Sequence, residues 1–388
     1  MGSARKIMYT SLRYYWQFEN EEVTMSDSLS TDAASAAAHT QPARPARKGE
    51  ERPQWVLNLK KYEKASVGRA AWQVINTAGP YLLFLALMYL TMRMGLPIWI
   101  TLLLAVPAGG FLVRLFILFH DCTHGSFLPT QRGVRVLGTI IGCVTFTPFA
   151  DWRHAHGVHH STSGNLDRRG LGDVWTMTVD EYVASKPLRR FLYRSFRNPF
   201  VMFGLGPLFM FIIVQRFPTR HAKWNQVRSV LFTDLVIAAL VVIGILTIGL
   251  KAYLIIHFVP FLIAGSAGIW LFYVQHQFDP SYWERAEEWG SMESALEGSS
   301  YYKLPKVLQW FSGNIGLHHV HHLRPRIPNY NLERCLRETP ELQLKDALTL
   351  RRSWKSIRLN IWDEANKQLI SFRTMAKMLR AQQAQLAG

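Results

Sequence analysis

The sequence predicts an all-α membrane protein in which four transmembrane helices carry a cytosolic helical cap, and the cap holds a histidine-ligated metal site. Three observations of the 388-residue chain point to this fold class. Hydrophobic residues make up 49% of the chain and charged residues only 18%, against about 25% charged residues in soluble domains. The basic residues that give the formal net charge of +17 are concentrated between long apolar runs, and 11 of the 14 histidines lie near the ends of those runs or in three clusters.

The composition excludes several other classes of protein. The high apolar content excludes a disordered chain, and three cysteines in 388 residues exclude a disulfide scaffold. A basic chain would suit a nucleic-acid binder. Here the Lys and Arg residues follow the topology of a membrane protein, so we expect no nucleic-acid partner.

Residues 1–53 are expected to form a disordered N-terminal tail. The stretch 28–48 is rich in Ala, Ser, Thr, Pro and Arg and has no apolar periodicity, a composition that cannot bury a core. The start of translation stays open between Met1 and Met25.

The membrane domain is predicted to cover residues 54–345. Four apolar runs of about 17 to 23 residues are long enough for a helix to cross a hydrocarbon core about 30 Å thick. They cover residues 76–92, 97–119, 229–250 and 252–274. Two shorter runs, 136–150 and 201–214, suit interfacial segments that do not cross. Residues 346–388 are expected to form a cytosolic C-terminal helical tail.

Basic residues give the expected orientation. The connection from Arg153 to Arg228 is rich in Arg and Lys, whereas the short links on the opposite side have only Arg93 and Lys251. Because Lys and Arg mark the cytoplasmic side, both termini and the long central connection are predicted to be cytoplasmic. A soluble protein with four buried helices is the alternative, and it leaves this charge asymmetry without a cause.

Most of the histidines fall into three clusters with regular spacing. The clusters are HDCTH at 120–124, HAHGVHH at 154–160 and HHVHH at 318–322, and His276 directly follows the fourth apolar run. The pattern H-x-x-H-H occurs twice, where chance would give about 0.02 copies in a chain of this composition. Residues at i, i+3 and i+4 share one helical face, so each cluster presents several imidazoles together.

Nine histidines are therefore the predicted metal ligands. Neutral imidazole suits iron, copper, nickel and zinc. Nine rings exceed the coordination number of one ion, so two redox-active metal ions are implied. The ligands are His120, His124, His156, His159, His160, His276, His318, His321 and His322.

The other five histidines are expected outside the ligand set. We interpret His39 and His221 as solvated bystanders and His257 as a hydrogen-bonded histidine inside the fourth run. His154 and His319 are expected to be neighbours of the ligands. The alternative for all of the clusters, solvated surface histidines, does not explain why three clusters lie beside the ends of apolar runs.

These motifs resemble those of the integral-membrane fatty acid desaturase family, with its three boxes H-x-x-x-H, H-x-x-H-H and H-x-x-H-H. Within that family the chain is most similar to the acyl-lipid ω6 (Δ12) desaturases of bacteria and plastids. The likeness lies in HDCTHGSF (120–127), HHSTSGNLDRRGLGDVWTMTVDEY (159–182), FYVQHQF (272–278) and LEGSSYYKLPKVLQWFSGNIGLHHVHHLRPRIPNYNL (296–332).

The resemblance implies a non-haem di-iron centre ligated by the nine histidines, with O₂ as co-substrate and a membrane-lipid acyl chain as substrate. It implies a cis double bond as product, at the Δ12 (ω6) position of a monounsaturated chain. Electrons would come from a separate ferredoxin or b-type cytochrome. In stearoyl-type relatives an Asn one helical turn before the fourth-run histidine completes the site through water. The corresponding residue here is Phe272.

Two further sets of residues are candidates for supporting roles. Asp121, Asp151 and Asp173 could hold histidine N–H groups. An apolar substrate tunnel from the bilayer could be lined by the aromatic residues that flank the boxes, namely Trp152, Trp175, Tyr273 and Trp310. The alternatives are surface carboxylates and ordinary core or interface aromatics.

Two other functions use the same motifs. A membrane di-iron hydroxylase or ketolase of alkanes, carotenoids or sterols would share the boxes and the topology, but the segments around the boxes favour the desaturase. A histidine-rich metal transporter would need ionisable residues or broken helices near mid-membrane, for which only His257 and its neighbours offer a hint. We expect an integral multi-pass protein of a bacterial inner membrane.

Overall fold

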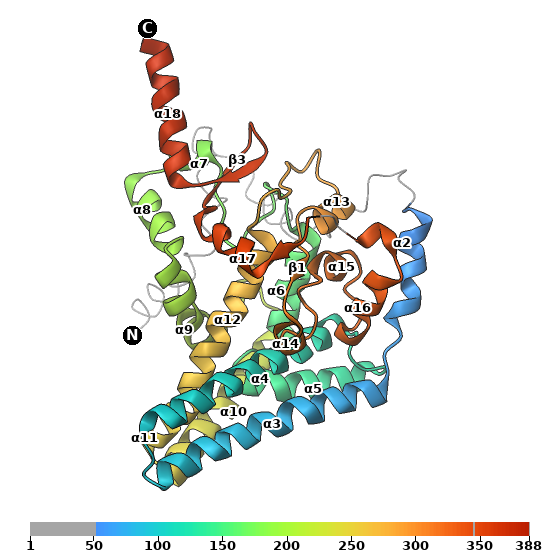
Figure 1. Cartoon of the computed structure of the whole chain (residues 1–388), viewed down its shortest axis with the longest axis vertical. Helices are drawn as coiled ribbons and strands as arrows, with labels where there is room; N and C mark the ends of the chain where they lie inside the picture. Colours follow the sequence, from blue (N-terminus) through green and yellow to red (C-terminus); the bar gives the residue numbers. More distant parts are fainter. Residues whose placement is uncertain (1–51, 344–345, 388) are drawn as a thin grey trace.

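The computed structural model describes residues 52–343 and 346–387. Most of the predicted N-terminal tail, including His39, therefore lies outside the described residues. The chain is mostly helical within them, with four short strands at one end (Figure 1).

Four helices are long and apolar enough to cross a membrane. They are α3 (Val67–Arg93), α4 (Ile98–His124), α10 (Trp224–Ile248) and the continuous segment Leu250–His276. The last is built from α11 (Leu250–Tyr253), the π-helical turn η7 (Leu254–Phe258) and α12 (Val259–His276). α3 and α4 lie side by side, and α12 packs against the other side of α4 (Figure 1).

Local sequence determines where these helices begin and end. Ser66 accepts a hydrogen bond from the Arg69 N–H, which caps α3 a full two turns before the predicted apolar run starts. α4 begins directly after Pro97 and ends at Gly125, whose φ of 71° is left-handed. Because Gly enters this region freely, it terminates α4 immediately after His124. The helix therefore presents His120 and His124 in its last two turns.

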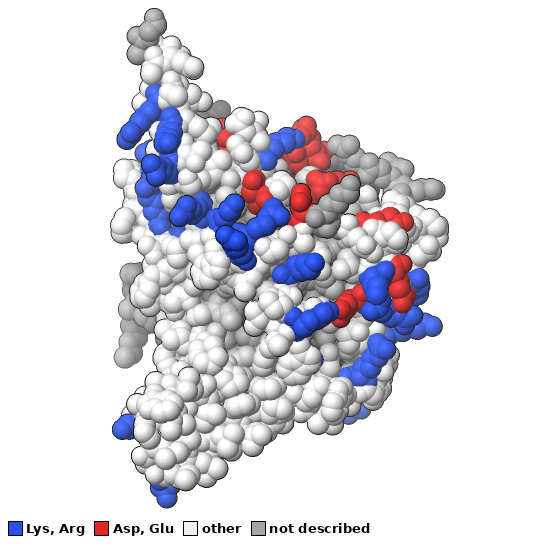
Figure 2. All heavy atoms as spheres, viewed as in Figure 1, with Lys and Arg blue, Asp and Glu red and all other residues white. Residues whose placement is uncertain are grey.

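The long helices have a polar end and a hairpin end. Arg93 closes α3 and Lys251 lies in α11, so the tight connections α3–α4 and α10–α11 share the hairpin end. His124 and His276 close α4 and α12 at the other end. Figure 2 shows a broad surface over the long helices with almost no charged side chain, and Lys, Arg, Asp and Glu gathered on the rest of this face. This distribution fits an apolar belt below a polar layer.

Two bent helix pairs connect the second and third long helices. α5 (Gln131–Val144) and α6 (Phe149–Thr162) meet at 99°, and α8 (Pro187–Phe196) meets the segment Val201–Arg216 at 67°. That second segment consists of η4 (Val201–Leu205), α9 (Gly206–Leu208), η5 (Phe209–Ile213) and η6 (Val214–Arg216).

The bounds of the first bent pair differ from the expected segment 136–150. Thr130 accepts a hydrogen bond from the Gly133 N–H and starts α5 five residues earlier. The chain then breaks at Phe146, which has a φ of 57°, and α6 begins after Pro148. The turn sends α6 toward the polar end, where it carries the second histidine cluster.

The polar end, which we call the cap, consists of short elements wrapped around α15. Its N-terminal and central helices are α2 (Gln54–Asn58), η3 (Leu59–Glu63), α7 (Val179–Ala184), α13 (Ser291–Leu296), α14 (Lys306–Phe311), α15 (His318–Leu323), α16 (Asn329–Arg337) and η8 (Pro340–Leu342). Leu317, Val320, Ile327 and Leu332 bury together with Leu59 and form the core of this layer.

Residues 346–387 are less helical than the expected tail. β2 (Leu348–Thr349) pairs in parallel with β1 (Tyr302–Lys303), and α17 (Leu350–Ser353) and η9 (Trp354–Arg358) follow. β3 (Ile361–Asp363) and β4 (Gln368–Ile370) then form an antiparallel hairpin before α18 (Phe372–Ala387). The hairpin buries Ile361 and Trp362 against the cap, which a free tail would not do. Only α18 extends away from the molecule (Figure 1).

Candidate metal centre

The structure brings all nine predicted ligands together where α4 and α12 meet the cap. The rings form two groups, and within each group the ligand nitrogen atoms lie within 4.8 Å of one another. The first group consists of His120, His124, His156, His160 and His321. The second consists of His159, His276, His318 and His322.

The spacing H-x-x-H-H explains how one helix serves both groups. Successive residues on an α-helix are rotated by about 100°, so residues at i and i+4 lie nearly in line while i+3 points to one side. In α6, His156 and His160 enter the first group and His159 the second. In α15 the assignment is exchanged, because the i and i+4 residues His318 and His322 enter the second group and His321 the first.

Two hydrogen bonds determine which nitrogen atoms of the second group carry lone pairs. His159 Nδ1 lies 2.5 Å from Asp173 Oδ1, and His276 Nδ1 lies 3.3 Å from the carbonyl oxygen of Gly298. A carbonyl and a carboxylate only accept, so in each neutral ring Nδ1 carries the proton and Nε2 does not. These two Nε2 atoms nevertheless lie 3.1 Å apart. Two lone pairs at that distance repel each other unless a cation lies between them.

The distances between other ligand atoms follow the same pattern. Nε2 of His156 lies 2.9 Å from that of His120 and 3.1 Å from that of His160. Nε2 of His318 lies 3.0 Å from that of His276. For metal–nitrogen bonds of about 2.1 Å, adjacent ligands of an octahedral ion are about 3.0 Å apart and those of a tetrahedral ion about 3.4 Å. The observed distances are short enough for neighbouring rings of each group to share one metal ion.

Several buried ring atoms have no partner within the described part of the chain. They are Nδ1 of His120, His160, His318 and His321, and Nε2 of His124 and His322. A buried polar atom without a hydrogen-bond partner is costly. Bound metal would account for Nε2 of His124 and His322, whereas the four Nδ1 atoms belong to rings whose Nε2 atoms face other rings of the site. Burial also lowers the pKa of His318, His321 and His322 well below the usual range. These rings are therefore neutral, which is the form that binds metal.

The three candidate carboxylates have different partners. Asp173 holds His159, as described above. Asp121 Oδ1 lies 3.5 Å from His120 Nδ1, while its Oδ2 accepts hydrogen bonds from the backbone N–H and the side-chain amide of Asn329. Asp151 accepts from the backbone N–H and the hydroxyl of Thr219, so it fixes the loop before α10 rather than a histidine ring.

A glycine brings Asp173 to His159. Gly172 has a φ of 83°, and a Cβ added to it would lie 2.9 Å from the Ala155 carbonyl oxygen and 3.0 Å from the His159 Cβ. Only Gly fits this close approach to α6 without strain. The Asp173 carboxylate also accepts from the Gly170 N–H at 3.2 Å.

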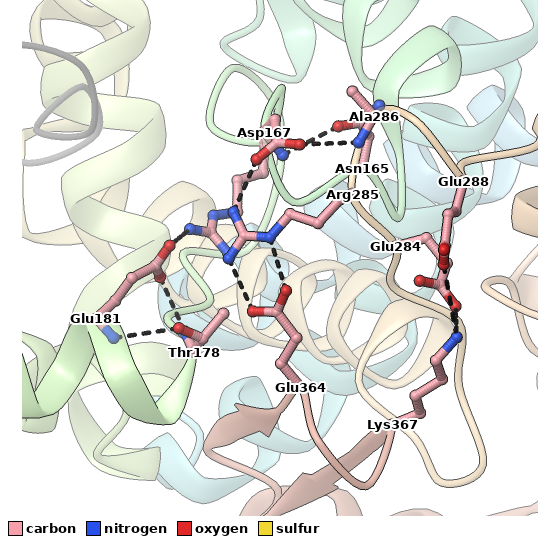
Figure 3. A network of polar contacts seen from close by, with 11 residues as sticks. Asn165, Asp167, Thr178, Glu181, Glu284, Arg285, Ala286, Glu288, Glu364 and Lys367 are labelled. Atoms are coloured by element: carbon pink, nitrogen blue, oxygen red, sulfur yellow. Dashed lines mark hydrogen bonds and ion pairs between the residues drawn. The ribbon is translucent and has the colours of Figure 1, made fainter.

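A polar network holds the rest of this loop (Figure 3). Arg285 donates two hydrogen bonds to Glu364 in the β3–β4 connection and one to Asp167, each at 2.7 Å. Lys367 binds Glu284 in the same region. The network joins the loop after α6, the segment after α12 and the C-terminal hairpin. The C-terminal residues thus brace the loop that carries Asp173.

Of the four candidate tunnel aromatics, Trp152 lies against a ligand ring. It stacks on His156 with ring centres 4.2 Å apart and contacts Phe119 on its other side, at 5.3 Å. Trp175 packs edge-on against Tyr193. Tyr273 donates from its hydroxyl to the Ser356 carbonyl oxygen, at 2.9 Å.

The fourth aromatic, Trp310, belongs to a contact that sequence reasoning missed. The Arg114 guanidinium lies 4.0 Å from the centre of the Trp310 ring and donates to the Trp310 carbonyl oxygen and to Thr77 Oγ1. This contact fixes α14 to α3 and α4 and keeps a buried arginine inside the helix bundle. In the sequence, the one sign of this contact is a positively charged residue, Arg114, within an apolar run.

The remaining histidines lie outside both groups. His319 donates from Nε2 to the Leu342 carbonyl oxygen, at 2.9 Å. His154 and His221 are exposed, and His257 of η7 packs beside Tyr253 of α11. Phe272 packs 5.2 Å from both the His159 and the His276 rings, at the position where stearoyl-type relatives have Asn.

Comparisons with known proteins agree with this geometry. The sequence model described as fatty acid desaturase matches residues 96–354. The chain belongs to the fatty acid desaturase family. This desaturase is similar to a Bacillus subtilis protein named fatty acid desaturase, with 45% identity over 303 residues, 78% of this chain and 86% of that protein.

More distant relatives of this desaturase have names that state a bond position. An sn-1 oleoyl-lipid 12-desaturase of Synechocystis is 27% identical over 229 residues, covering 58% of this chain and 64% of that protein. A chloroplastic omega-6 fatty acid desaturase of Arabidopsis thaliana is 25% identical over 233 residues, covering 58% of this chain and 50% of that protein.

Two other groups of the site were not found from the sequence. The Gly298 carbonyl that orients His276 is a backbone atom, and no residue pattern marks it. Asn329 follows Pro328 at the start of α16. In the sequence, this position indicates only the beginning of a helix. Its bond to Asp121 depends on a contact across 208 positions of the chain.

Proposed function

We propose that this protein inserts a cis double bond into an acyl chain of a membrane lipid, with two iron ions held by the nine histidines and O₂ as the oxidant. The observation that carries the proposal is the approach of the Nε2 atoms of His159 and His276 to 3.1 Å, with the Nδ1 atom of each ring facing an acceptor. Family membership and the all-imidazole ligand set support iron over calcium or magnesium, which prefer oxygen ligands.

The reaction balances with two external electrons. One O₂, two electrons and two protons convert a CH₂–CH₂ pair into CH=CH and two waters. Bound iron would supply the activation of O₂ and the hydrogen abstraction. The protein's own residues hold the nitrogen lone pairs in place, exclude water and position the acyl chain. Asp173 and the Gly298 carbonyl keep the Nδ1 protons of His159 and His276, and α15 carries neutral rings.

An acyl chain would approach from the apolar helices. Phe116, Phe119 and Trp152 form a continuous aromatic contact from the interior of α4 to the His156 ring. This path supports Trp152 as a residue that guides the substrate, and Phe272 as the apolar wall beside the second group. Trp175, Tyr273 and Trp310 are proposed to line the outer parts of the same tunnel.

We place the new double bond at the Δ12 (ω6) position of a monounsaturated acyl lipid, a placement supported by the names of the more distant relatives. The electron donor is proposed to be a ferredoxin or a b-type cytochrome. The cap and both termini are proposed to face the cytoplasm of a bacterium, with the four long helices in its inner membrane, because of the positive charge of the connections.

The test is expression in a host that makes saturated and monounsaturated lipids but no dienoic acids, followed by fatty-acid mass spectrometry with the double bond located. A dienoic acid with a Δ12 bond is expected. A new bond at another position would keep desaturation and reject the Δ12 placement. A hydroxylated or oxidised product would assign the chain to a hydroxylase or ketolase, and metal uptake without a lipid product would indicate a transporter.

A further inference from the structure

The outer face of α6 is exposed and basic, and it borders the first histidine group. Arg153, His154 and Gly157 are exposed on this helix, while Asp151 and His156 are buried on its other side. His160 is half-buried and lies three residues after Gly157. At i+3 it continues the exposed stripe, so one ligand residue of the first group is partly exposed there, while its ring Nδ1 is buried.

A second basic segment is held beside this face. Asp151 accepts two hydrogen bonds from Thr219, at 2.9 and 3.1 Å. This contact places the exposed residues Arg220, His221 and Lys223 next to the start of α6. The exposed residues of α6 and of this neighbouring segment together form a basic surface, and we call it the α6 face; its residues are Arg153, His154, Arg220, His221 and Lys223.

Nothing acidic neutralises the α6 face within its own segments. Between residues 122 and 166 the only carboxylate is the buried Asp151, and residues 199–233 contain none. Some arginines of other cap segments are paired, as Arg169 is with Glu181 and Arg324 with Glu63. No ion pair of Arg153 or Arg220 occurs among residues 52–343 and 346–387. The charge of the α6 face is therefore available to an acidic partner.

The helix surface at Gly157, one turn after Arg153 and His154, is open. A Cβ added at Gly157 meets no atom within 4 Å, which distinguishes it from Gly172 on the neighbouring loop. Gly157 therefore adds no side chain to the helix surface three residues before His160. His124 is the other half-buried ligand of this group. A redox group brought to this face would lie one imidazole ring from the metal position.

We propose that the α6 face is the docking surface for an acidic one-electron carrier protein. The inference rests on the proposed function, which needs two electrons from outside for each double bond. The carrier delivers them one at a time through the edge of His160 or His124. Anionic lipid headgroups would also be attracted by these charges, but they do not explain an opening that coincides with the half-buried ligands.

Charge reversal tests the docking surface. The probe is a reduced [2Fe–2S] ferredoxin, kept reduced by its reductase and NADPH. For Arg153→Glu with Arg220→Glu, we expect the KM for ferredoxin to rise at least tenfold at low salt, with a smaller change in kcat. The difference in the ferredoxin KM between this variant and the wild type should decrease as ionic strength rises, because salt screens exposed charges. The matched control, Arg351→Glu with Lys355→Glu, makes the same change in charge on α17 and η9 and should shift KM less than twofold.

A steric variant separates docking from general charge. Gly157→Trp fills the open surface, and we expect at least a tenfold loss of ferredoxin-driven kcat/KM, whereas Gly157→Ala should lose less than threefold. The iron content of every variant is measured, so that a loss of metal is not taken for a loss of docking. A ferredoxin KM that is insensitive to both charge reversal and Gly157→Trp would overturn the proposal.

Two further measurements assign a failure to its cause. Wild-type protein is reduced anaerobically with dithionite, freed of excess reductant and mixed with O₂. If no double bond forms in this single turnover, the proposed function itself fails. If it forms while the variants keep the wild-type KM for ferredoxin, only the docking surface is wrong. Charge reversal that weakens binding to anionic nanodiscs without changing that KM would reassign the α6 face to lipid headgroups.

Discussion

Asp173 Oδ1 lies 2.5 Å from Nδ1 of His159, and both side chains are buried. This contact fixes the tautomer of His159 and turns its Nε2 lone pair toward the Nε2 of His276. Residues Gly164 to Gly172 form a loop that follows α6. The loop turns back toward this helix, so that Asp173 meets His159. The second histidine group therefore depends on a carboxylate that follows the second box by only 13 residues.

Removal of this carboxylate should weaken the metal site. For Asp173→Ala we expect about a 10- to 100-fold loss of iron affinity, the usual effect of removing a partner of a metal-bound histidine. Asp173→Asn should lie between Ala and wild type, because its amide oxygen still accepts. The measurement is iron retention against a graded chelator. Asp151→Ala is the control, and equal iron loss in both variants would contradict the assignment of Asp173.

The close approach of Gly172 to α6 gives a prediction for stability. Gly172→Ala would place a Cβ 2.9 Å from the Ala155 carbonyl oxygen at a φ of 83°, so we expect a loss of about 1–3 kcal/mol in the free energy of unfolding. Gly157 lies in a helix with open space around it, so Gly157→Ala should raise the free energy of unfolding by up to about 1 kcal/mol. Thermal unfolding of the two purified variants compares them directly. If Gly172→Ala has the same free energy of unfolding as the wild type, the loop accommodates the added methyl group without loss of stability.

Loss of single ligands should remove activity while the protein remains in the membrane. His120→Ala, His160→Ala and His321→Ala each remove a ring of the first group, and we expect at least a 100-fold decrease of unsaturated product. His39→Ala changes a histidine outside the predicted ligand set and should change the product yield less than twofold. Product is quantified by mass spectrometry and protein by immunoblot of membranes. Full activity in the three ligand variants would exclude the first group as the reaction centre.

Acid should destabilise the cap. Burial lowers the pKa of His319 to about 4, and it lowers those of His318, His321 and His322 as well, whereas an unfolded histidine titrates near about 6.5. Below about pH 6.5 the unfolded chain therefore binds more protons than the folded chain, and the free energy of unfolding falls with falling pH. Each such histidine contributes up to about 1.4 kcal/mol per pH unit.

Denaturant unfolding of the detergent-solubilised protein between pH 7.5 and 5 measures this slope. His319→Gln removes one of the buried histidines without removing a predicted ligand, and the slope should decrease by about one proton. A slope that stays the same in His319→Gln would mean that this ring is not neutral in the folded protein.

The long helices could be predicted from the sequence because bilayer thickness alone sets their length. α4 and α12 end within five residues of the predicted apolar runs, at His124 and His276. α3 extends nine residues before its run because Ser66 supplies an N-cap in a polar stretch. The break at Phe146 could not be predicted, since its left-handed backbone is fixed by contacts of the surrounding helices and not by its residue type.

The nine rings could be predicted to converge because H-x-x-H-H has only one arrangement on a helix. Their distribution between two groups could not, since it depends on how α6 and α15 face each other. The same holds for the carboxylates. Asp121, Asp151 and Asp173 look alike in the sequence, and only their tertiary partners, Asn329, Thr219 and His159, distinguish them.

The convergence of nine imidazoles on two metal positions is the central claim, and metal analysis of the purified protein tests it most directly. The protein is expressed in iron-containing medium, purified in detergent and analysed for all transition metals. The account predicts about two iron atoms per chain, as expected for five and four ligands, and a clear loss in His276→Ala. One metal per chain, or two zinc ions in place of iron, would contradict it.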